Sequence, residues 1–141
     1  MQTFLPYADF NKSAKCLDYR RLGKQRVEAY QVYRVISGVR TTGGWINHPV
    51  VNMWTGFCDA LADYHNVMIR EWISRGYVNN MKYIDVSDSY ELPKFIGCQD
   101  FHDSHRSNLL KKDYYFYSSY NWEVPDNLPY LWPGKQVYQD I

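Results

Sequence analysis

The chain is organised around one run of residues, Cys16-Leu17-Asp18-Tyr19-Arg20-Arg21-Leu22-Gly23-Lys24-Gln25-Arg26-Val27-Glu28. One row of residues at helical spacing runs along it and beyond, through Asp18, Arg21, Gln25, Glu28, Val32 and Val35. Because the apolar end of this row must enter a core, its charged end reaches the edge of that core. Charged side chains are stable at the edge of a core only when they form ion pairs or face a cleft filled with water. The stretch therefore predicts a helix over residues 18–37 with polar groups along its first half.

Two further helices are predicted on either side of a long loop. A proline at the first helical position begins the helix over residues 49–75, an apolar stripe continues it, and Gly76 ends it. Gly56 can divide this helix into two pieces. Helical spacing predicts the other helix over residues 100–112, whereas residues 77–97 have no sustained period and are read as a loop. No sheet of more than two short strands is expected.

The length of 141 residues and a hydrophobic content of 45% are enough for one globular domain with a real core. We therefore expect a compact, all-α single domain over residues 1–141, with three principal helices, long loops and an aromatic C-terminal tail. The chain has 14 Tyr and 5 Trp, many of them in that tail. The tail is expected to wrap the domain. Its rings either cover the core or stay exposed as a stacking surface.

The net charge of +1 hides an uneven distribution. Residues 11–40 hold eight Lys or Arg against Asp18 and Glu28, whereas residues 113–141 hold Lys135 against four carboxylates. The basic end is the candidate anion-binding face, and a merely solvated helix face is the alternative.

Cysteine and histidine patterns indicate neither a disulfide framework nor a metal site. The three cysteines are far apart and form no CxxC pair, which favours a reducing compartment. His102 and His105 are three residues apart, but spacing supplies no third ligand and the neighbouring cations disfavour a metal. We expect no metal and no cofactor. No segment resembles a signal peptide or a membrane span, so a cytoplasmic protein is expected.

Several motifs together resemble a known family. They are Met1-Gln2-Thr3-Phe4-Leu5-Pro6-Tyr7, the run from Leu17 to Glu28, His48-Pro49 with Met53-Trp54, Arg70-Glu71-Trp72 with Arg75-Gly76-Tyr77, and Ser104-His105-Arg106-Ser107 with Leu109-Leu110 and Lys112. In these motifs the chain resembles the small phage and bacterial proteins grouped with the pyrimidine dimer DNA glycosylases, relatives of the phage enzyme endonuclease V. If the protein is phage-encoded, the compartment is the host cytoplasm.

The resemblance implies a compact all-α domain that binds duplex DNA and acts in DNA repair. In that family a free N-terminal α-amine attacks the sugar C1′ of a damaged nucleotide and a glutamate assists. The resulting Schiff base allows strand cleavage by elimination, which makes the enzyme both a glycosylase and an AP lyase. Free α-amines have a pKa of about 7.7 to 8.0, so a fraction of them is neutral and nucleophilic at physiological pH.

This sequence departs from the family at both catalytic positions. The family's Tyr-Arg-Glu-Leu matches Tyr19-Arg20-Arg21-Leu22, so Arg21 stands where the glutamate is expected. A bulky second residue, Gln2, usually leaves the initiator methionine in place, so the nucleophile would be the Met1 α-amine. Glu28 lies two turns beyond Arg21 on the same row and Asp18 lies one turn before it, so either carboxylate could assist. The competing interpretation is that Asp18, Arg21 and Glu28 form a structural ion network.

We expect the protein to be a monomer. Six cations and one histidine are its predicted DNA contacts. They are Arg20, Lys24, Arg26, His105, Arg106, Lys111 and Lys112.

Three functional hypotheses remain open. The first is a glycosylase with AP lyase activity on damaged or modified bases in duplex DNA. The second is a DNA-binding protein without that chemistry, and the third is a pocket for a small phosphorylated ligand.

Overall fold

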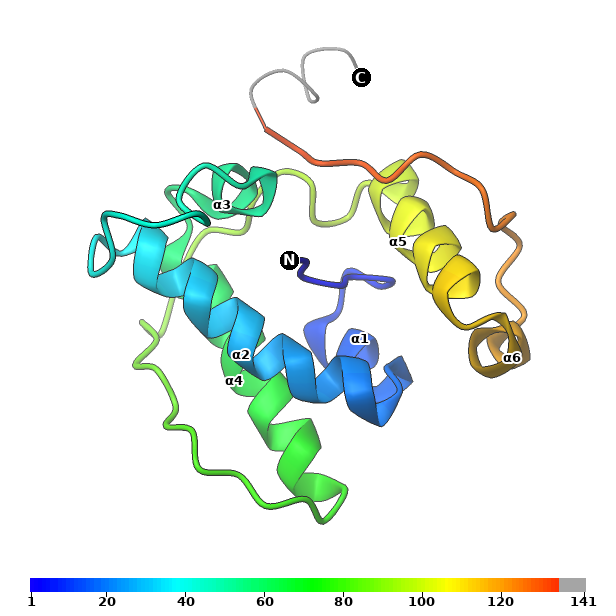
Figure 1. The fold of residues 1–141 in the computed structure, drawn as a ribbon, viewed down its shortest axis with the longest axis horizontal. Coiled ribbons are helices and arrows are strands. Elements are labelled where there is room, and N and C mark those ends of the chain that lie inside the picture. The colour runs from blue at the N-terminus through cyan, green and yellow to red at the C-terminus, as the bar shows by residue number, and fades with distance from the viewer. Residues whose placement is uncertain (135–141) are drawn as a thin grey trace.

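The computed structural model describes residues 1–134, which form an all-α arrangement without strands (Figure 1). Its elements are α1 (Phe10–Cys16), α2 (Tyr19–Ile36), α3 (Pro49–Trp54), α4 (Cys58–Ser74), α5 (Gln99–Lys112), α6 (Tyr114–Tyr117) and the 3₁₀ helix η1 (Ser118–Tyr120). The predicted all-α class and the helices near residues 18–37 and 100–112 are confirmed. The helix predicted over 49–75 is divided into α3 and α4 around Gly56, whose φ is +89°.

The helices α1, α2 and α3 begin at side chains that cap their free backbone amides. Asp9 accepts hydrogen bonds from two N–H groups at the start of α1, and Asp18 accepts one from the Arg21 N–H of α2. His48 caps α3 with its ring Nδ1, which accepts from the Val50 N–H at 3.1 Å. The end of α4 is followed by Gly76, whose φ of +89° turns the chain away from the helix.

The helices α2 and α4 run side by side in opposite directions and form the main core. A Cβ atom added to Gly23 of α2 would lie only 3.0 Å from the Trp72 ring of α4, so glycine permits this close approach. Leu22, Ala29 and Val32 of α2 are fully buried against α4. The loop after α4 contains no helix or strand, and Asn66 of α4 anchors it by hydrogen bonds to both the N–H and the carbonyl of Ile84.

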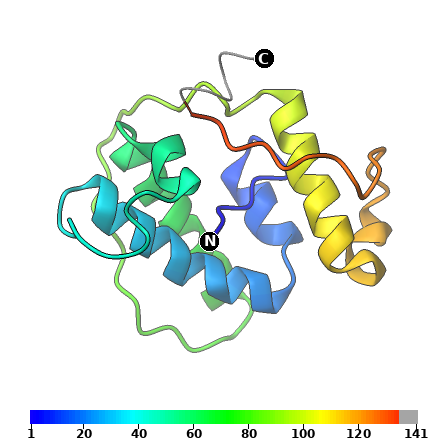
Figure 2. The ribbon, with the colours of Figure 1, turned by 45° about the horizontal axis from the view of Figure 1, so that its top comes forward.

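The first seven residues pass through the middle of the molecule, between the α2–α4 pair and α5 (Figures 1 and 2). We call residues 1–7 the N-terminal segment. Because it pairs with no strand, side chains from the surrounding helices take up its backbone groups. Gln25 of α2 bonds to two of its backbone groups, and Tyr64 of α4 and His105 of α5 bond to one each. The segment is therefore fixed from several directions.

The chain beyond α5 returns across the surface, as expected for a wrapping tail. Tyr117, Tyr120 and Trp122 stack against one another beside the start of α2. Residues 128–134, here called the strap, then cross above the N-terminal segment (Figure 2). Other rings remain exposed, among them Tyr114 and Tyr115 of α6. No helix within residues 1–134 has the length and apolar character needed to span a bilayer.

Candidate active site

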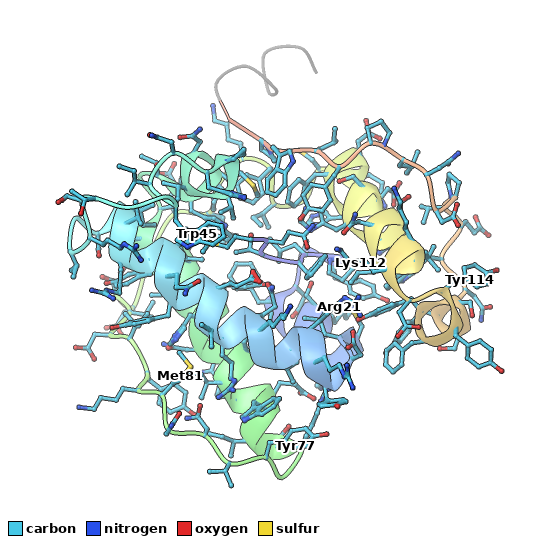
Figure 3. The ribbon with its side chains drawn as sticks, viewed as in Figure 1. Arg21, Trp45, Tyr77, Met81, Lys112 and Tyr114 are labelled. Atoms are coloured by element: carbon cyan, nitrogen blue, oxygen red, sulfur yellow. The ribbon has the colours of Figure 1, made fainter. Side chains whose placement is uncertain are left out.

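A cleft of about 560 Å³ opens between the first half of α2, the N-terminal segment and the end of α5. Its walls are formed by Gln2, Phe4, Arg20, Arg21, Lys24, Gln25, Glu28 and Lys112. Figure 3 labels Arg21 on α2 and Lys112 on α5, which face the same space. Four cations and one carboxylate around one opening make this the strongest anion-binding feature among the described pockets.

Glu28 and Gln25 hold the start of the chain against the cleft. The Gln2 N–H donates to Glu28 Oε2 at 3.0 Å, and the Phe4 N–H donates to Gln25 Oε1 at 2.9 Å. Gln25 Nε2 in turn donates to the Gln2 carbonyl at 3.1 Å. We call Met1, Gln2, Gln25 and Glu28 the amine site, because they bring the beginning of the chain to a carboxylate.

The α-amine belongs to Met1, the residue just before the Gln2 N–H that Glu28 accepts, and among residues 1–134 no ion pair joins the amine to Glu28. The Met1 side chain packs against the core and helps to hold the start of the chain in place. His48 at the start of α3 is affected by the charges of both groups. Its pKa is lowered by partial burial and by the positive N-terminus, while the negative charge of Glu28 opposes that shift. The charges of the amine and of Glu28 thus both act on His48.

Asp18 has a different role from Glu28, although both lie on the same row of α2. Asp18 Oδ1 pairs with Arg21 at 3.1 Å and also accepts from the Tyr117 hydroxyl, and its Oδ2 caps α2. Although partial burial opposes it, hydrogen bonds from Tyr117 and Arg21 hold the pKa of Asp18 below its usual range. We call Asp18, Arg21 and Tyr117 the cap cluster. The predicted ion network therefore includes Asp18 and Arg21, with Glu28 bound elsewhere.

The predicted DNA contacts separate into two groups. Arg20, Lys24 and Lys112 line the cleft together with Arg21, and Lys111 is exposed beside Lys112.

Three other predicted contacts point into the structure. Arg26 stacks on the Trp72 ring at 4.1 Å and donates to Asn79 at 2.8 Å, outside the cleft lining. Arg106 donates to the Pro6 carbonyl at 2.7 Å and lies over the Tyr7 ring, so it clamps the N-terminal segment.

His105, predicted as a DNA contact, lies inside the protein in this structure. Its side chain is fully buried, and its Nδ1 accepts a hydrogen bond from the Leu5 N–H at 2.8 Å. Burial holds its pKa well below the usual histidine value, so the ring is neutral. Its partner His102, also buried, bonds to the Leu5 carbonyl at 2.7 Å. Within residues 1–134, no group of three His, Cys, Asp or Glu is placed to hold a metal ion.

Sequence reasoning did not identify Gln2, Gln25 and His48 as parts of this site. Gln25 carried a signal, because it is a polar residue in a row that turns apolar, and it is only 1% exposed. Gln2 gave none, since its contacts with Glu28 and with Asn108 join segments far apart in the chain.

Comparison with protein families identifies a matching family. Residues 1–85 match the family model described as pyrimidine dimer DNA glycosylase. This range includes α1 to α4 and every residue of the cleft lining except Lys112. Searches of curated proteins and of solved structures returned no significant match.

Proposed function

Because the chain belongs to the pyrimidine dimer DNA glycosylase family, we propose that this DNA repair glycosylase is also an AP lyase whose nucleophile is the Met1 α-amine. Glu28 is the assisting carboxylate of the proposal. The observation that carries it is the 3.0 Å hydrogen bond from the Gln2 N–H to Glu28 at the wall of a cationic cleft. That bond brings the start of the chain to a carboxylate, where an amine nucleophile needs one.

The proposed reaction takes place at the deoxyribose of a damaged nucleotide. The neutral amine attacks C1′, and the base leaves with the electron pair of the broken C1′–N bond and takes up a proton. Opening of the sugar ring then gives a Schiff base between the Met1 nitrogen and C1′. Loss of a proton from C2′ expels the 3′ phosphate and cuts the strand. No oxidant or reductant is required.

Glu28 assists by charge and by proton transfer. Its carboxylate stabilises the positive charge that develops on the sugar and then on the protonated Schiff base. The Gln2 N–H that it accepts belongs to the residue next to the amine, so Glu28 is the base proposed to remove the C2′ proton. Arg21, although it stands where the family glutamate is expected, lines the same cleft and contributes positive charge to it.

The cations of the cleft are proposed to hold the DNA backbone. Arg20, Arg21, Lys24 and Lys112 come from the two helices that border the cleft. Phosphate contacts of this kind give affinity without reading sequence, and binding weakens with salt because condensed counterions are released. Extruding a nucleotide toward the amine costs a few kcal/mol and less at damaged sites, which favours lesions.

The presence of Arg21 in the family's glutamate position favours one alternative, a protein that binds duplex DNA without cutting it. Borohydride reduction separates the two functions, because it traps a Schiff base as a stable amine. We expect a crosslink between the protein and a duplex containing an abasic site, mapped by mass spectrometry to the N-terminal peptide. A second duplex with a pyrimidine dimer tests the glycosylase step.

A matched pair of variants sharpens this experiment. Glu28→Gln should abolish the adduct, whereas Asp18→Asn on the same row should retain it. A version with extra residues before Met1 moves the amine out of the site and should also lose the adduct. A crosslink on Lys24 would transfer the nucleophile to that residue. No adduct on either duplex, together with salt-dependent binding, would leave the non-enzymatic function.

A further inference from the structure

The hydroxyl group of Tyr130 in the strap is buried without a hydrogen-bond partner. Part of the tyrosine side chain reaches the surface, but its hydroxyl oxygen has no appreciable exposed area. Among residues 1–134, no atom bonds to it. Buried polar groups are nearly always paired, so this hydroxyl calls for an explanation.

The strap is attached to α5 in a defined register. The Leu128 N–H donates to Ser107 Oγ at 2.9 Å, and the Leu131 N–H donates to Ser104 Oγ at 3.3 Å. Both serines are buried and lie one turn apart on the same face of α5. Tyr130 is therefore held between two anchored positions of the strap.

The Tyr130 ring is oriented by residues that also hold the N-terminal segment. It stacks on the His105 ring with 4.6 Å between centroids and an angle of 27°, and His105 accepts from the Leu5 N–H. On the strap itself, Trp132 packs against Tyr130 at 4.6 Å and against His48 at 5.4 Å. A line of rings thus runs from α5 to the start of α3 alongside the N-terminal segment.

The Tyr130 hydroxyl lies within the electrostatic reach of Glu28. Burial raises the pKa of Tyr130 well above its usual value, and the negative charge of Glu28 raises it further. The same two groups, Tyr130 and Glu28, also raise the pKa of Tyr64, after its burial. Tyr130 therefore keeps its proton and stays available as a hydrogen-bond donor close to the amine site.

Phenylalanine at this position would keep the stacked ring and remove the unpaired hydroxyl. An unpaired buried hydroxyl destabilises the folded state, so its presence is typical of a group that gains its partner only when a ligand binds. Glu28 is the charged acceptor that acts on Tyr130, and within residues 1–134 the Gln2 N–H engages Oε2 of Glu28 while Oε1 has no hydrogen bond.

We propose that Tyr130 is a positioning residue of the amine site, whose hydroxyl donates a hydrogen bond to the Glu28 carboxylate when DNA fills the cleft. This inference rests on the proposed function, because it assigns how Glu28 is oriented for the reaction. It also gives a role to the chain beyond residue 85, which lies outside the family match.

The test compares Tyr130→Phe with wild type and with Tyr64→Phe in the full chain. Tyr64 is the matched control because its buried hydroxyl has partners, the Phe4 carbonyl at 2.8 Å and Gln25 Oε1 at 2.5 Å. Three quantities are measured: the melting temperature, the affinity for a duplex with an abasic site, and the single-turnover rate of borohydride trapping. Tyr64→Phe should lower the melting temperature.

For Tyr130→Phe we expect an equal or higher melting temperature, unchanged affinity, and a trapping rate at least about tenfold lower. A trapping rate equal to wild type would overturn the inference and leave the proposed function intact. A lower melting temperature with a proportional loss of rate would also overturn it, because the hydroxyl would then be structural. No adduct with wild type would reject the proposed function and this inference together.

Discussion

The cap cluster and the amine site lie two to three turns apart on one helix, yet they treat their carboxylates in opposite ways. Asp18 receives hydrogen bonds from Arg21, Tyr117 and the α2 backbone, so its acceptor capacity is largely used inside the protein. Within residues 1–134, Glu28 accepts one hydrogen bond, from the Gln2 N–H, and it borders the cleft. Along the same row of α2, the first carboxylate is bound within the protein, whereas the last one is free to interact with a ligand in the cleft.

The difference arises from the segments that pack beside each site. The tail brings Tyr117 to the cap cluster. Its hydroxyl donates a hydrogen bond to the Asp18 carboxylate, which therefore needs less hydrogen bonding from water. The N-terminal segment brings only a backbone amide to Glu28, together with the beginning of the chain. A charge on a helix face is therefore structural or functional according to what its neighbours can donate.

The largest effect is expected for Glu28→Gln, which removes the available charge of the amine site. The amide keeps the size of the side chain and an acceptor for Gln2, so the fold should persist. We expect trapping and strand cleavage to fall by about 10² to 10⁴, the usual value of a placed acid or base. Single-turnover cleavage of an abasic duplex measures it. Cleavage within a few fold of wild type would contradict the role of Glu28.

Gln25→Ala should destabilise the structure of the amine site rather than remove a reacting group from it. The substitution leaves the Phe4 N–H without its acceptor, removes one of the two partners of the Tyr64 hydroxyl, and creates a small cavity. We expect the free energy of unfolding to drop by about 2 to 4 kcal/mol. Urea denaturation followed by tryptophan fluorescence measures this change. A loss below about 0.5 kcal/mol would show that other groups hold the N-terminal segment.

Asp18→Ala should weaken the cap cluster by a smaller amount, about 1 to 2 kcal/mol, since a helix cap and a partly exposed ion pair are lost. The pKa of Asp18 is lowered in the folded state. Its contribution is therefore present above the ordinary aspartate pKa of about 3.9 and is lost as the pH falls through the lower folded value. The free energy of unfolding, measured between pH 2 and 7, should fall with decreasing pH in wild type and should fall less in Asp18→Ala.

Lys24→Ala and Arg26→Ala form the pair with the smallest effects. Lys24 lines the cleft, so its loss should lower the log–log slope of DNA binding against salt by about 0.9. Arg26 is held by Trp72 and Asn79, so its loss should leave that slope unchanged and cost about 0.5 to 1 kcal/mol of stability. Fluorescence anisotropy at several salt concentrations distinguishes them. A reduced slope in Arg26→Ala would restore Arg26 as a phosphate contact.

Local signals predicted most of the fold. Asp18 and Gly76 mark helix ends because caps and positive φ angles are properties of a few adjacent residues. The row on α2 also identified Glu28 as a candidate, and it borders the cleft. Spacing could not tell that Arg26 lies over Trp72 or that Arg106 clamps Pro6, because those directions depend on segments distant in the chain.

His105 illustrates the same limit on the opposite side of the cleft. Its neighbours in the chain include cations, which favoured a place on the surface. Its actual partner, the Leu5 N–H, is 100 residues away, and no periodicity relates the two. The residues of the amine site were likewise brought together by the path of the N-terminal segment, which sequence patterns leave open.

The path of the N-terminal segment also has a consequence for how the protein folds. During synthesis residues 1–7 leave the ribosome well before α5, which supplies partners for Leu5 and Pro6. Contacts of such long sequence separation carry a large loop-closure cost and slow folding. The helices α1 to α4 can pack together earlier, so the amine site is expected to be completed in the last step of folding.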